Sequence, residues 1–181
     1  MKKLAIVLSV GLVLGLAISF VIAVAMDKTA TPEFCGSCHI MKPMKKSFYI
    51  SVHGSNNMHG FASTHCTDCH APHDSLIGYM VFKAVKGAKD GLAEIGLFGK
   101  PDFEKNYNNM SKYVYDSGCL ECHSGVKNPD TAYKMSKASV YAHKLYWKDK
   151  KEHKDVSCVN CHNDSTEQNF AHPELLENLS N

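Results

Sequence analysis

A five-residue pattern, C-x-x-C-H, occurs four times in this chain and uses all eight of its cysteines. The pattern is the attachment signature of c-type haem, in which two thiols bond to the vinyl groups of one porphyrin. The adjacent histidine is then placed to bind the iron as an axial ligand. The predicted haem-binding cysteines are Cys35, Cys38, Cys66, Cys69, Cys119, Cys122, Cys158 and Cys161. The motif histidines are His39, His70, His123 and His162.

Cysteine pairs at this spacing also form zinc sites and redox disulfides. Neither kind of site requires a histidine directly after the second cysteine. Histidine makes up only 11 of the 181 residues, so four such neighbours are improbable by chance. We therefore predict that the chain binds four haem c groups.

Beyond its first 26 residues the chain has few long apolar runs from which to build a conventional core. Four haems would provide large apolar surfaces in place of such a core. We therefore predict a mainly α-helical fold with much irregular coil, a multihaem cytochrome c domain organised around four haems plus one N-terminal transmembrane helix. The formal net charge of +2 gives no indication of nucleic-acid binding.

The N-terminal segment is long and apolar enough to cross a membrane. Leu4 to Met26 carries no charge, and a helix of that length spans the roughly 30 Å hydrocarbon layer. The two lysines before it favour a cytoplasmic N-terminus. We therefore predict an anchor at residues 1–26 in the bacterial inner membrane and a periplasmic tetrahaem domain at residues 27–181.

A cleaved signal peptide is the alternative to this anchor. Ala23-Val24-Ala25 resembles a cleavage site, although the apolar stretch is longer than signal peptides usually have. Both interpretations carry the haem motifs across the membrane. The first motif follows the apolar segment after a short linker, so haem 1 must lie near the outer surface of the bilayer.

Two longer helices are expected outside the anchor. Residues 75–99 carry apolar side chains at helical spacing, edged by lysines. This pattern suits a helix on a membrane surface, and a helix packed on haem fits equally well. We expect this helix to end at Gly99-Lys100-Pro101 and a charged helix to follow at residues 132–154. A weak repeat suggests two dihaem halves, residues 27–100 and 101–181.

Four irons have up to eight axial positions, of which the motif histidines fill four. The repeat singles out four distal candidates, His53, His73, His143 and His172. At haem 1 the ligand is either His39 or Met41, because the first motif continues as C-x-x-C-H-x-M and methionine also binds haem iron. Two histidine ligands saturate an iron, which indicates electron transfer. We expect the remaining histidines to lie on the surface, namely His59, His65 and His153.

Taken together, the motifs resemble those of the NapC/NirT/NrfH family of membrane-anchored tetrahaem quinol dehydrogenases. The resemblance covers nearly the whole chain and includes Val52-His53 and Ala171-His172-Pro173. It implies that menaquinol is oxidised near haem 1 and that electrons pass through the haems to a periplasmic reductase. That partner would be a nitrite or nitrate reductase or another multihaem oxidoreductase, with which the chain could form an oligomer.

The resemblance also implies a quinol site on the helix of residues 75–99. Lys83 would hydrogen-bond a quinol oxygen, and Asp90 would lie near the open face of haem 1 and accept a proton. On the residues alone, a solvated helix face explains both side chains better. His73 and Met41 combine features of the NapC-like and NrfH-like branches, which leaves the haem 1 ligand and the reductase open.

Two other functions fit parts of the pattern. A membrane-tethered electron relay would carry the same haem motifs but bind no quinol. An enzyme that itself reduces a substrate such as nitrite often has a C-x-x-C-K motif, and this sequence contains none.

Overall fold

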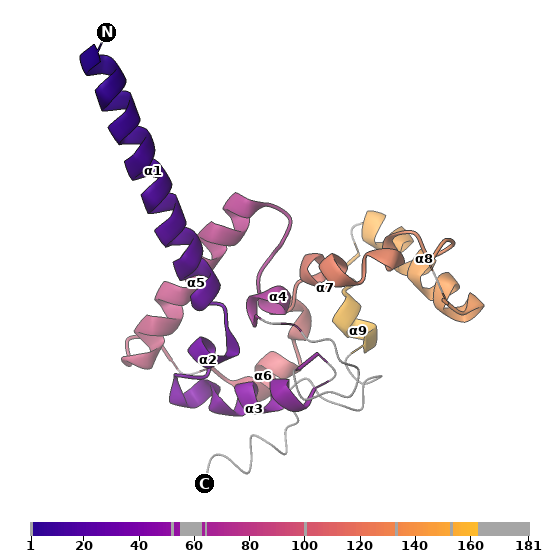
Figure 1. Ribbon diagram of the computed structural model, residues 1–181. Coiled ribbons are helices and arrows are strands. Elements are labelled where there is room, and N and C mark those ends of the chain that lie inside the picture. Colours follow the sequence, from indigo (N-terminus) through magenta and orange to yellow (C-terminus); the bar gives the residue numbers. More distant parts are fainter. Residues whose placement is uncertain are drawn as a thin grey trace.

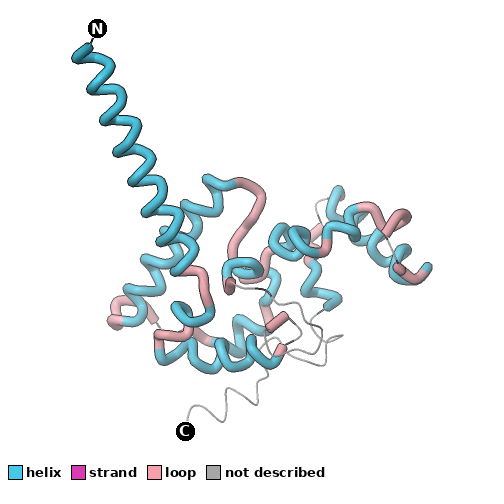
Figure 2. The backbone as a smooth tube through the Cα atoms, viewed as in Figure 1, coloured by secondary structure: helices cyan, strands magenta, loops and turns pink. Residues whose placement is uncertain are grey.

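The computed structural model describes residues 2–51, 53–54, 63, 65–99, 101–132, 134–152 and 154–162. These residues form helices, turns and coil, and none of them belongs to a strand (Figure 2). The predicted helical fold with one N-terminal apolar helix is therefore confirmed over the described part of the chain. The division into two dihaem halves stays a prediction.

Helix α1, Lys2–Lys28, projects from the rest of the molecule as a single rod (Figure 1). None of its residues is buried, and its most apolar stretch has a mean hydropathy of 2.8. So apolar a surface is unfavourable in water but suits the interior of a bilayer. Helix α1 thus has the length and composition of a membrane span.

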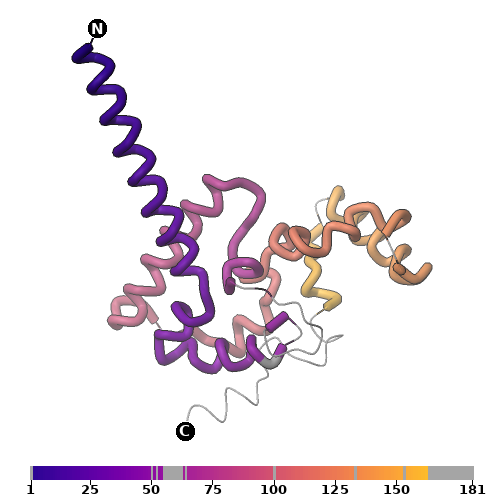
Figure 3. Tube along the Cα trace, viewed as in Figure 1, coloured from indigo at the N-terminus to yellow at the C-terminus, as the bar shows by residue number. Residues whose placement is uncertain are grey.

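Most of the other helices are short, and each C-x-x-C-H motif lies in or beside one of them. They are α2 (Pro32–Cys35), η1 (His39–Met41), α3 (Lys42–Ile50), α4 (Thr67–His70), α5 (Leu76–Glu94), α6 (Phe103–Tyr107), η2 (Met110–Lys112), α7 (Asp116–Cys122), η3 (Ser124–Lys127), α8 (Lys137–Lys151) and α9 (Cys158–His162). Figure 3 shows α1, α3 and α5 on one side of the molecule, α4 and α7 in the middle, and α8 and α9 on the far side.

Helix α5 begins and ends at residues suited to these positions. The Ser75 hydroxyl caps its N-terminus by accepting a backbone N–H. At the other end Gly96 has a φ of +84°, and the Leu97 N–H donates to the Leu92 carbonyl over 2.9 Å. Glycine adopts this left-handed conformation at little cost and so ends the helix. The predicted end at Gly99-Lys100-Pro101 was therefore too far along the chain.

The second half contains more structure than its polar sequence suggests. Residues 102–118 hold α6, η2 and the start of α7. The charged helix expected at residues 132–154 is α8, which is shorter at both ends. The Ser136 hydroxyl caps it by accepting the N–H of Ser139 over 3.1 Å.

The described residues contain almost no conventional hydrophobic core. Apart from prolines, their only buried apolar side chains are Ala30, Ala71, Val114 and Val159. Large apolar side chains lie exposed on α1, α5 and α8 instead. Domains of this length normally bury many large side chains against each other. Covalently attached haems would supply the apolar surface on which these short helices pack.

Candidate functional site

The eight motif cysteines are all free thiols, and each is half-buried or exposed. Within the described ranges, no three His, Cys, Asp or Glu side chains converge as a direct metal site requires. Haem c needs no such cluster, because its thiols bond to porphyrin carbons and its iron is bound by axial ligands. The donor set therefore fits haem c better than zinc.

The first two motifs meet at their first cysteines. A hydrogen bond with Cys66 lowers the pKa of the Cys35 thiol to about 7. The Cys66 N–H donates to the carbonyl of Ala30 over 2.9 Å, which places the second motif against the turn after α1. Groups attached at these two cysteines would therefore lie next to each other.

The second and third motifs meet where α4 packs against α7. The Tyr115 N–H, just before α7, donates to the carbonyl of Cys69 over 2.9 Å. Gly118 is buried at this contact, and a Cβ atom added there would lie within 3.0 Å of the backbone oxygen of Asp68. Only glycine lets the two motif helices approach so closely.

The third and fourth motifs are joined by the carboxylate of Asp116. Its Oδ2 atom accepts from the Tyr146 hydroxyl over 2.6 Å and from Lys150 Nζ over 2.9 Å. Its Oδ1 atom accepts from the Ser157 hydroxyl over 2.7 Å and from the Cys158 N–H over 2.9 Å. One side chain thereby holds α7, α8 and the start of α9 together.

The first cysteines of the third and fourth motifs repeat the arrangement of the first two. Cys119 and Cys158 form a hydrogen bond, which lowers the pKa of the Cys119 thiol. The same bond, together with burial, raises the pKa of Cys158. Direct contacts therefore connect the four motifs in their order along the chain, from the end of α1 to α9.

Two of the predicted distal histidines face motif histidines. The ring centroids of His53 and His123 are 6.2 Å apart, and those of His143 and His162 are 6.1 Å apart. Imidazoles on opposite faces of one iron have centroids about 6 Å apart, since the metal–nitrogen bond is about 2.0 Å and the ring centre lies about 1 Å further. Both pairs therefore have the spacing of a bis-histidine iron site.

Hydrogen bonds through Nδ1 orient two of the candidate ligands. His143 Nδ1 donates to the carbonyl of Ser139 over 2.8 Å. His70 Nδ1 donates to the carbonyl of Tyr113 over 2.9 Å. This is the usual bond that directs the other ring nitrogen, Nε2, toward a metal.

The other candidate ligands are placed less simply. His73 Nε2 lies 2.9 Å from the carbonyl of Thr67 in α4, so binding iron through Nε2 would require this bond to be exchanged. At the first motif, His39 Nδ1 lies 2.9 Å from the Glu94 carboxylate, and Met41 is half-buried in η1. His172 lies outside the described residues. The choice between His39 and Met41 stays open.

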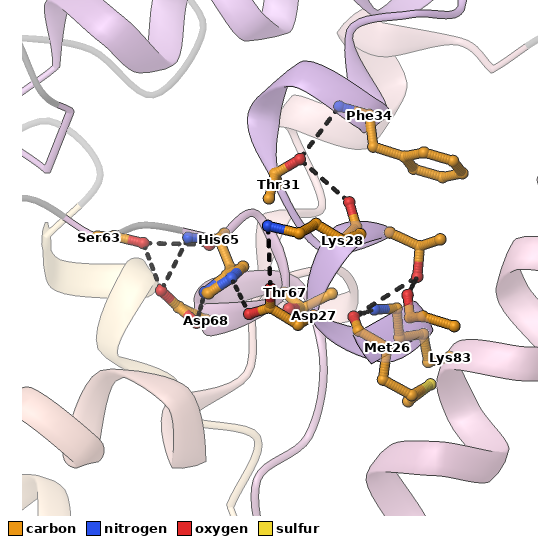
Figure 4. A network of polar contacts seen from close by, with 12 residues as sticks. Met26, Asp27, Lys28, Thr31, Phe34, Ser63, His65, Thr67, Asp68 and Lys83 are labelled. Carbon is orange, nitrogen blue, oxygen red and sulfur yellow. Dashed lines mark hydrogen bonds and ion pairs between the residues drawn. The ribbon is translucent and has the colours of Figure 1, made fainter. Parts of the chain in front are cut away.

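His65 was expected on the surface, but it is partly buried and bridges two elements. Its Nε2 atom lies 3.1 Å from the Asp27 carboxylate at the end of α1. Its backbone N–H donates to the Asp68 carboxylate in α4 over 3.1 Å, beside the hydroxyl of Ser63 (Figure 4). His65 thus ties the second motif to the end of α1.

The two predicted quinol-site residues act on the first motif. Lys83 Nζ donates to the carbonyl of Met26 in the last turns of α1 (Figure 4). The charge of Lys83 lowers the pKa of Cys35, whereas that of Asp90 raises it, so both lie near this thiol. Loss of water lowers the pKa of Lys83 and raises that of Asp90, although Lys86 and Lys89 oppose the second shift.

A profile of the NapC/NirT cytochrome c family, N-terminal region, matches residues 1–172. The chain belongs to the NapC/NirT cytochrome c family. As a member of this family it binds haem c and takes part in electron transport. The predicted resemblance is thereby confirmed.

Several family members are similar over most of the chain. The cytochrome c nitrite reductase subunit NrfH of Nitratidesulfovibrio vulgaris is 33% identical over 114 residues, or 63% of this chain and 65% of NrfH. NapC of Escherichia coli is 29% identical over 146 residues, or 76% of this chain and 68% of NapC. TorC of Escherichia coli is 28% identical over 172 residues, or 94% of this chain but only 36% of TorC.

The match to NrfH therefore spans just under two thirds of that protein, and the match to TorC about a third. Among solved structures, a crystal structure of the cytochrome c nitrite reductase NrfHA complex bound to the HQNO inhibitor contains a similar chain. The TM-score is 0.54 at 26% identity, and the alignment covers 91% of this chain and 92% of that one.

Sequence reasoning did not single out several residues that hold the motifs in place. Asp116, Glu94 and Gly118 stand in no recognisable pattern of their own. Gly118 precedes the third motif directly, and a glycine at that point was the one local signal of a close backbone approach.

Proposed function

We propose that this chain is a membrane-bound tetrahaem cytochrome c that oxidises menaquinol and delivers the electrons to a periplasmic reductase. The position of Lys83 and Asp90 carries the proposal. Both act on the thiol of Cys35, and Lys83 is bonded to the C-terminal end of α1. A lipid-soluble donor leaving the bilayer beside α1 would therefore reach these side chains and the first motif together.

We assign one haem c to each motif. His70, His123 and His162 would bind iron from the motif side, and either His39 or Met41 would do so at haem 1. The ring spacings favour His53 as the partner of His123, and His143 as the partner of His162. His73 and His172 are then the distal candidates for the remaining haems.

The side chains at the proposed quinol site suit proton removal. Oxidation of one quinol releases two electrons and two protons. Lys83 would hydrogen-bond a quinol oxygen, and its lowered pKa makes its proton easier to share. The raised pKa of Asp90 makes this carboxylate a better proton acceptor than an ordinary aspartate. The bound haems would take up the electrons singly and relay them along the four motifs.

The two lysines before the apolar stretch favour a cytoplasmic N-terminus, and the haem domain would then lie in the periplasm. The reductase is proposed from the similar proteins. The solved relative belongs to a complex named as a cytochrome c nitrite reductase. A multihaem nitrite reductase is therefore the first partner to test.

The test is stopped-flow haem reduction by a menaquinol analogue, with the full chain in liposomes. Asp90→Leu should slow reduction on the order of 100-fold, the usual loss on removing a general base. Lys83→Leu should also slow it. Lys148→Leu on α8, an exposed lysine far from the first motif, serves as the matched control. Full reduction of each variant by dithionite would show that its haem content is intact.

Unchanged rates in both quinol-site variants would refute the proposed site. Reduction by a reduced donor cytochrome but not by the quinol analogue would instead identify an electron relay. That is the second function considered from the sequence.

A further inference from the structure

Helix α5 contacts the rest of the molecule through one face. The Tyr79 hydroxyl donates to a threonine of α4 over 3.1 Å, and the Phe82 ring lies 5.3 Å from an aromatic ring before α7. Lys83 is bonded to the end of α1, and the Glu94 carboxylate lies 2.9 Å from the first motif histidine. These four positions lie on one side of the helix, because residues 3, 4 and 11 apart share a face.

The opposite face of α5 is apolar and exposed. Ile77, Val81, Val85 and Ile95 are 76%, 58%, 61% and 71% exposed. Ile77, Val81 and Val85 lie four residues apart on the helix, and Ile95 is its C-cap; we term these four residues the outer stripe. A helix on a soluble domain normally turns its apolar side chains inward. Helix α5 does the reverse, and an apolar stripe of this length indicates an interaction surface.

The first haem cannot cover the outer stripe from where its motif lies. Lys83 and Asp90 both act on Cys35, and Lys83 belongs to the inward face of α5. The thiol that would hold this haem therefore lies on the side away from the stripe. Among the described residues, all the contacts of α5 given above also come from that inward side.

The position of α5 relative to α1 indicates what covers the stripe. Figure 1 shows α5 crossing the C-terminal end of α1, where Lys83 is bonded to the Met26 carbonyl. The charged pair Asp27 and Lys28 ends the apolar helix there. A helix is about 10 Å across, so α5 lies within about one helix diameter of the level at which α1 leaves the bilayer.

We propose that the outer stripe of α5 is a second membrane contact, seated at the boundary between acyl chains and headgroups of the bilayer that α1 crosses. Lys89, four residues after Val85, is exposed beside the stripe and suits anionic headgroups. Two contacts, α1 and α5, would fix the tilt of the domain and keep the first motif at the lipid surface. The contact rests on α1 as a membrane span and does not require a quinol donor.

The test uses the full holoprotein in anionic liposomes that contain a phospholipid with a diazirine in its acyl chain. After irradiation, mass spectrometry locates the labelled residues. Helix α8 is an internal control, because Tyr141 and Leu145 are 71% and 46% exposed on a helix far from α1 (Figure 3). We expect the peptide with Val81 and Val85 to be labelled on the order of tenfold more than that of α8.

Variants make the result specific to the stripe. The double variant Val81→Asp, Val85→Asp should lower labelling of α5 severalfold, because charged side chains leave the acyl region. Leu145→Asp on α8 should leave labelling of α5 unchanged. These positions are exposed, so the haem content and Soret spectrum should match those of the wild type.

Labelling of α5 no higher than that of α8 would overturn the proposal. Slow quinol oxidation with normal α5 labelling would refute only the quinol site, so the two proposals fail separately.

Discussion

The carboxylate of Asp116 offers the most direct test of how the third and fourth motifs are held together. It accepts four hydrogen bonds, and its side chain is 12% exposed. Two of its donors, the buried Ser157 hydroxyl and the Cys158 N–H, have little access to water. Removing the carboxylate should therefore loosen α7 from α8 and α9.

The size of the effect follows from these partners. In Asp116→Ala, each buried donor left without an acceptor costs about 1–3 kcal/mol. Lys150 is 42% exposed and can return to water, so its loss adds little. We therefore expect Asp116→Ala to lower the free energy of unfolding by about 2–5 kcal/mol. Asp116→Asn keeps an acceptor for Ser157 and Cys158, and should cost about 1–2 kcal/mol.

The assay is denaturant unfolding of the holoprotein in detergent, followed by far-UV circular dichroism. Asp130→Asn is the matched control, because Asp130 pairs with Lys144 over 2.6 Å but both side chains are more than half exposed. An exposed pair contributes about 0–1 kcal/mol, so this variant should unfold nearly as the wild type does. Equal stability of Asp116→Ala and Asp130→Asn would refute our reading of Asp116 as a structural centre.

Acid should mimic the substitution. Burial alone would raise the pKa of Asp116, but the hydrogen bonds from Tyr146, Lys150, Ser157 and Cys158 outweigh it and lower the pKa well below the ordinary value. A carboxyl with a lowered pKa stabilises the fold above its unfolded pKa, about 3.9. That stability is lost as the pH falls through the pKa of Asp116 in the folded protein. The difference between wild type and Asp116→Ala should therefore shrink progressively below about pH 4.

Three further predictions concern the motif contacts. Gly118→Ala should separate α4 from α7 and lower the yield of folded holoprotein. Gly125→Ala should not, because the nearest atom to a Cβ added at Gly125 would be 3.9 Å away. Equal yields of the two variants would contradict the role of Gly118. His143→Ala should convert one ferric haem from low to high spin in the electron paramagnetic resonance spectrum, and an unchanged spectrum would exclude it as a ligand. Glu94→Gln should raise the potential of haem 1, because it removes a negative charge beside the first motif histidine, and unchanged potentials would contradict this placement of Glu94.

The features that were predicted best from the sequence depend on residues that are close together along the chain. The haem motifs are contiguous, and the anchor and α5 follow from composition and periodicity over one segment. The Tyr146 and Cys158 partners of Asp116 lie 30 and 42 residues away, so no local pattern could reveal them. The bridging contact of His65 was missed for the same reason, because its partner Asp27 is 38 residues away.

The error at the end of α5 has a different origin. Several glycines lie within and after this segment, and only the backbone conformation at Gly96 shows which one ends the helix. Ligand pairing also depends on tertiary structure. His53 lies close to His123, and His143 lies close to His162. The distance along the chain between the members of each pair does not indicate that they share an iron.

The scarcity of aliphatic core residues also affects how this protein unfolds. Thioether bonds keep the porphyrins on the chain in denaturant, so the denatured ensemble retains its largest apolar groups. Such an ensemble stays compact and exposes less new surface on unfolding than an ordinary chain of this length. The free energy of unfolding should therefore fall only gradually as the denaturant concentration rises. A chain that has not passed through haem attachment would lack those groups and remain open to proteases.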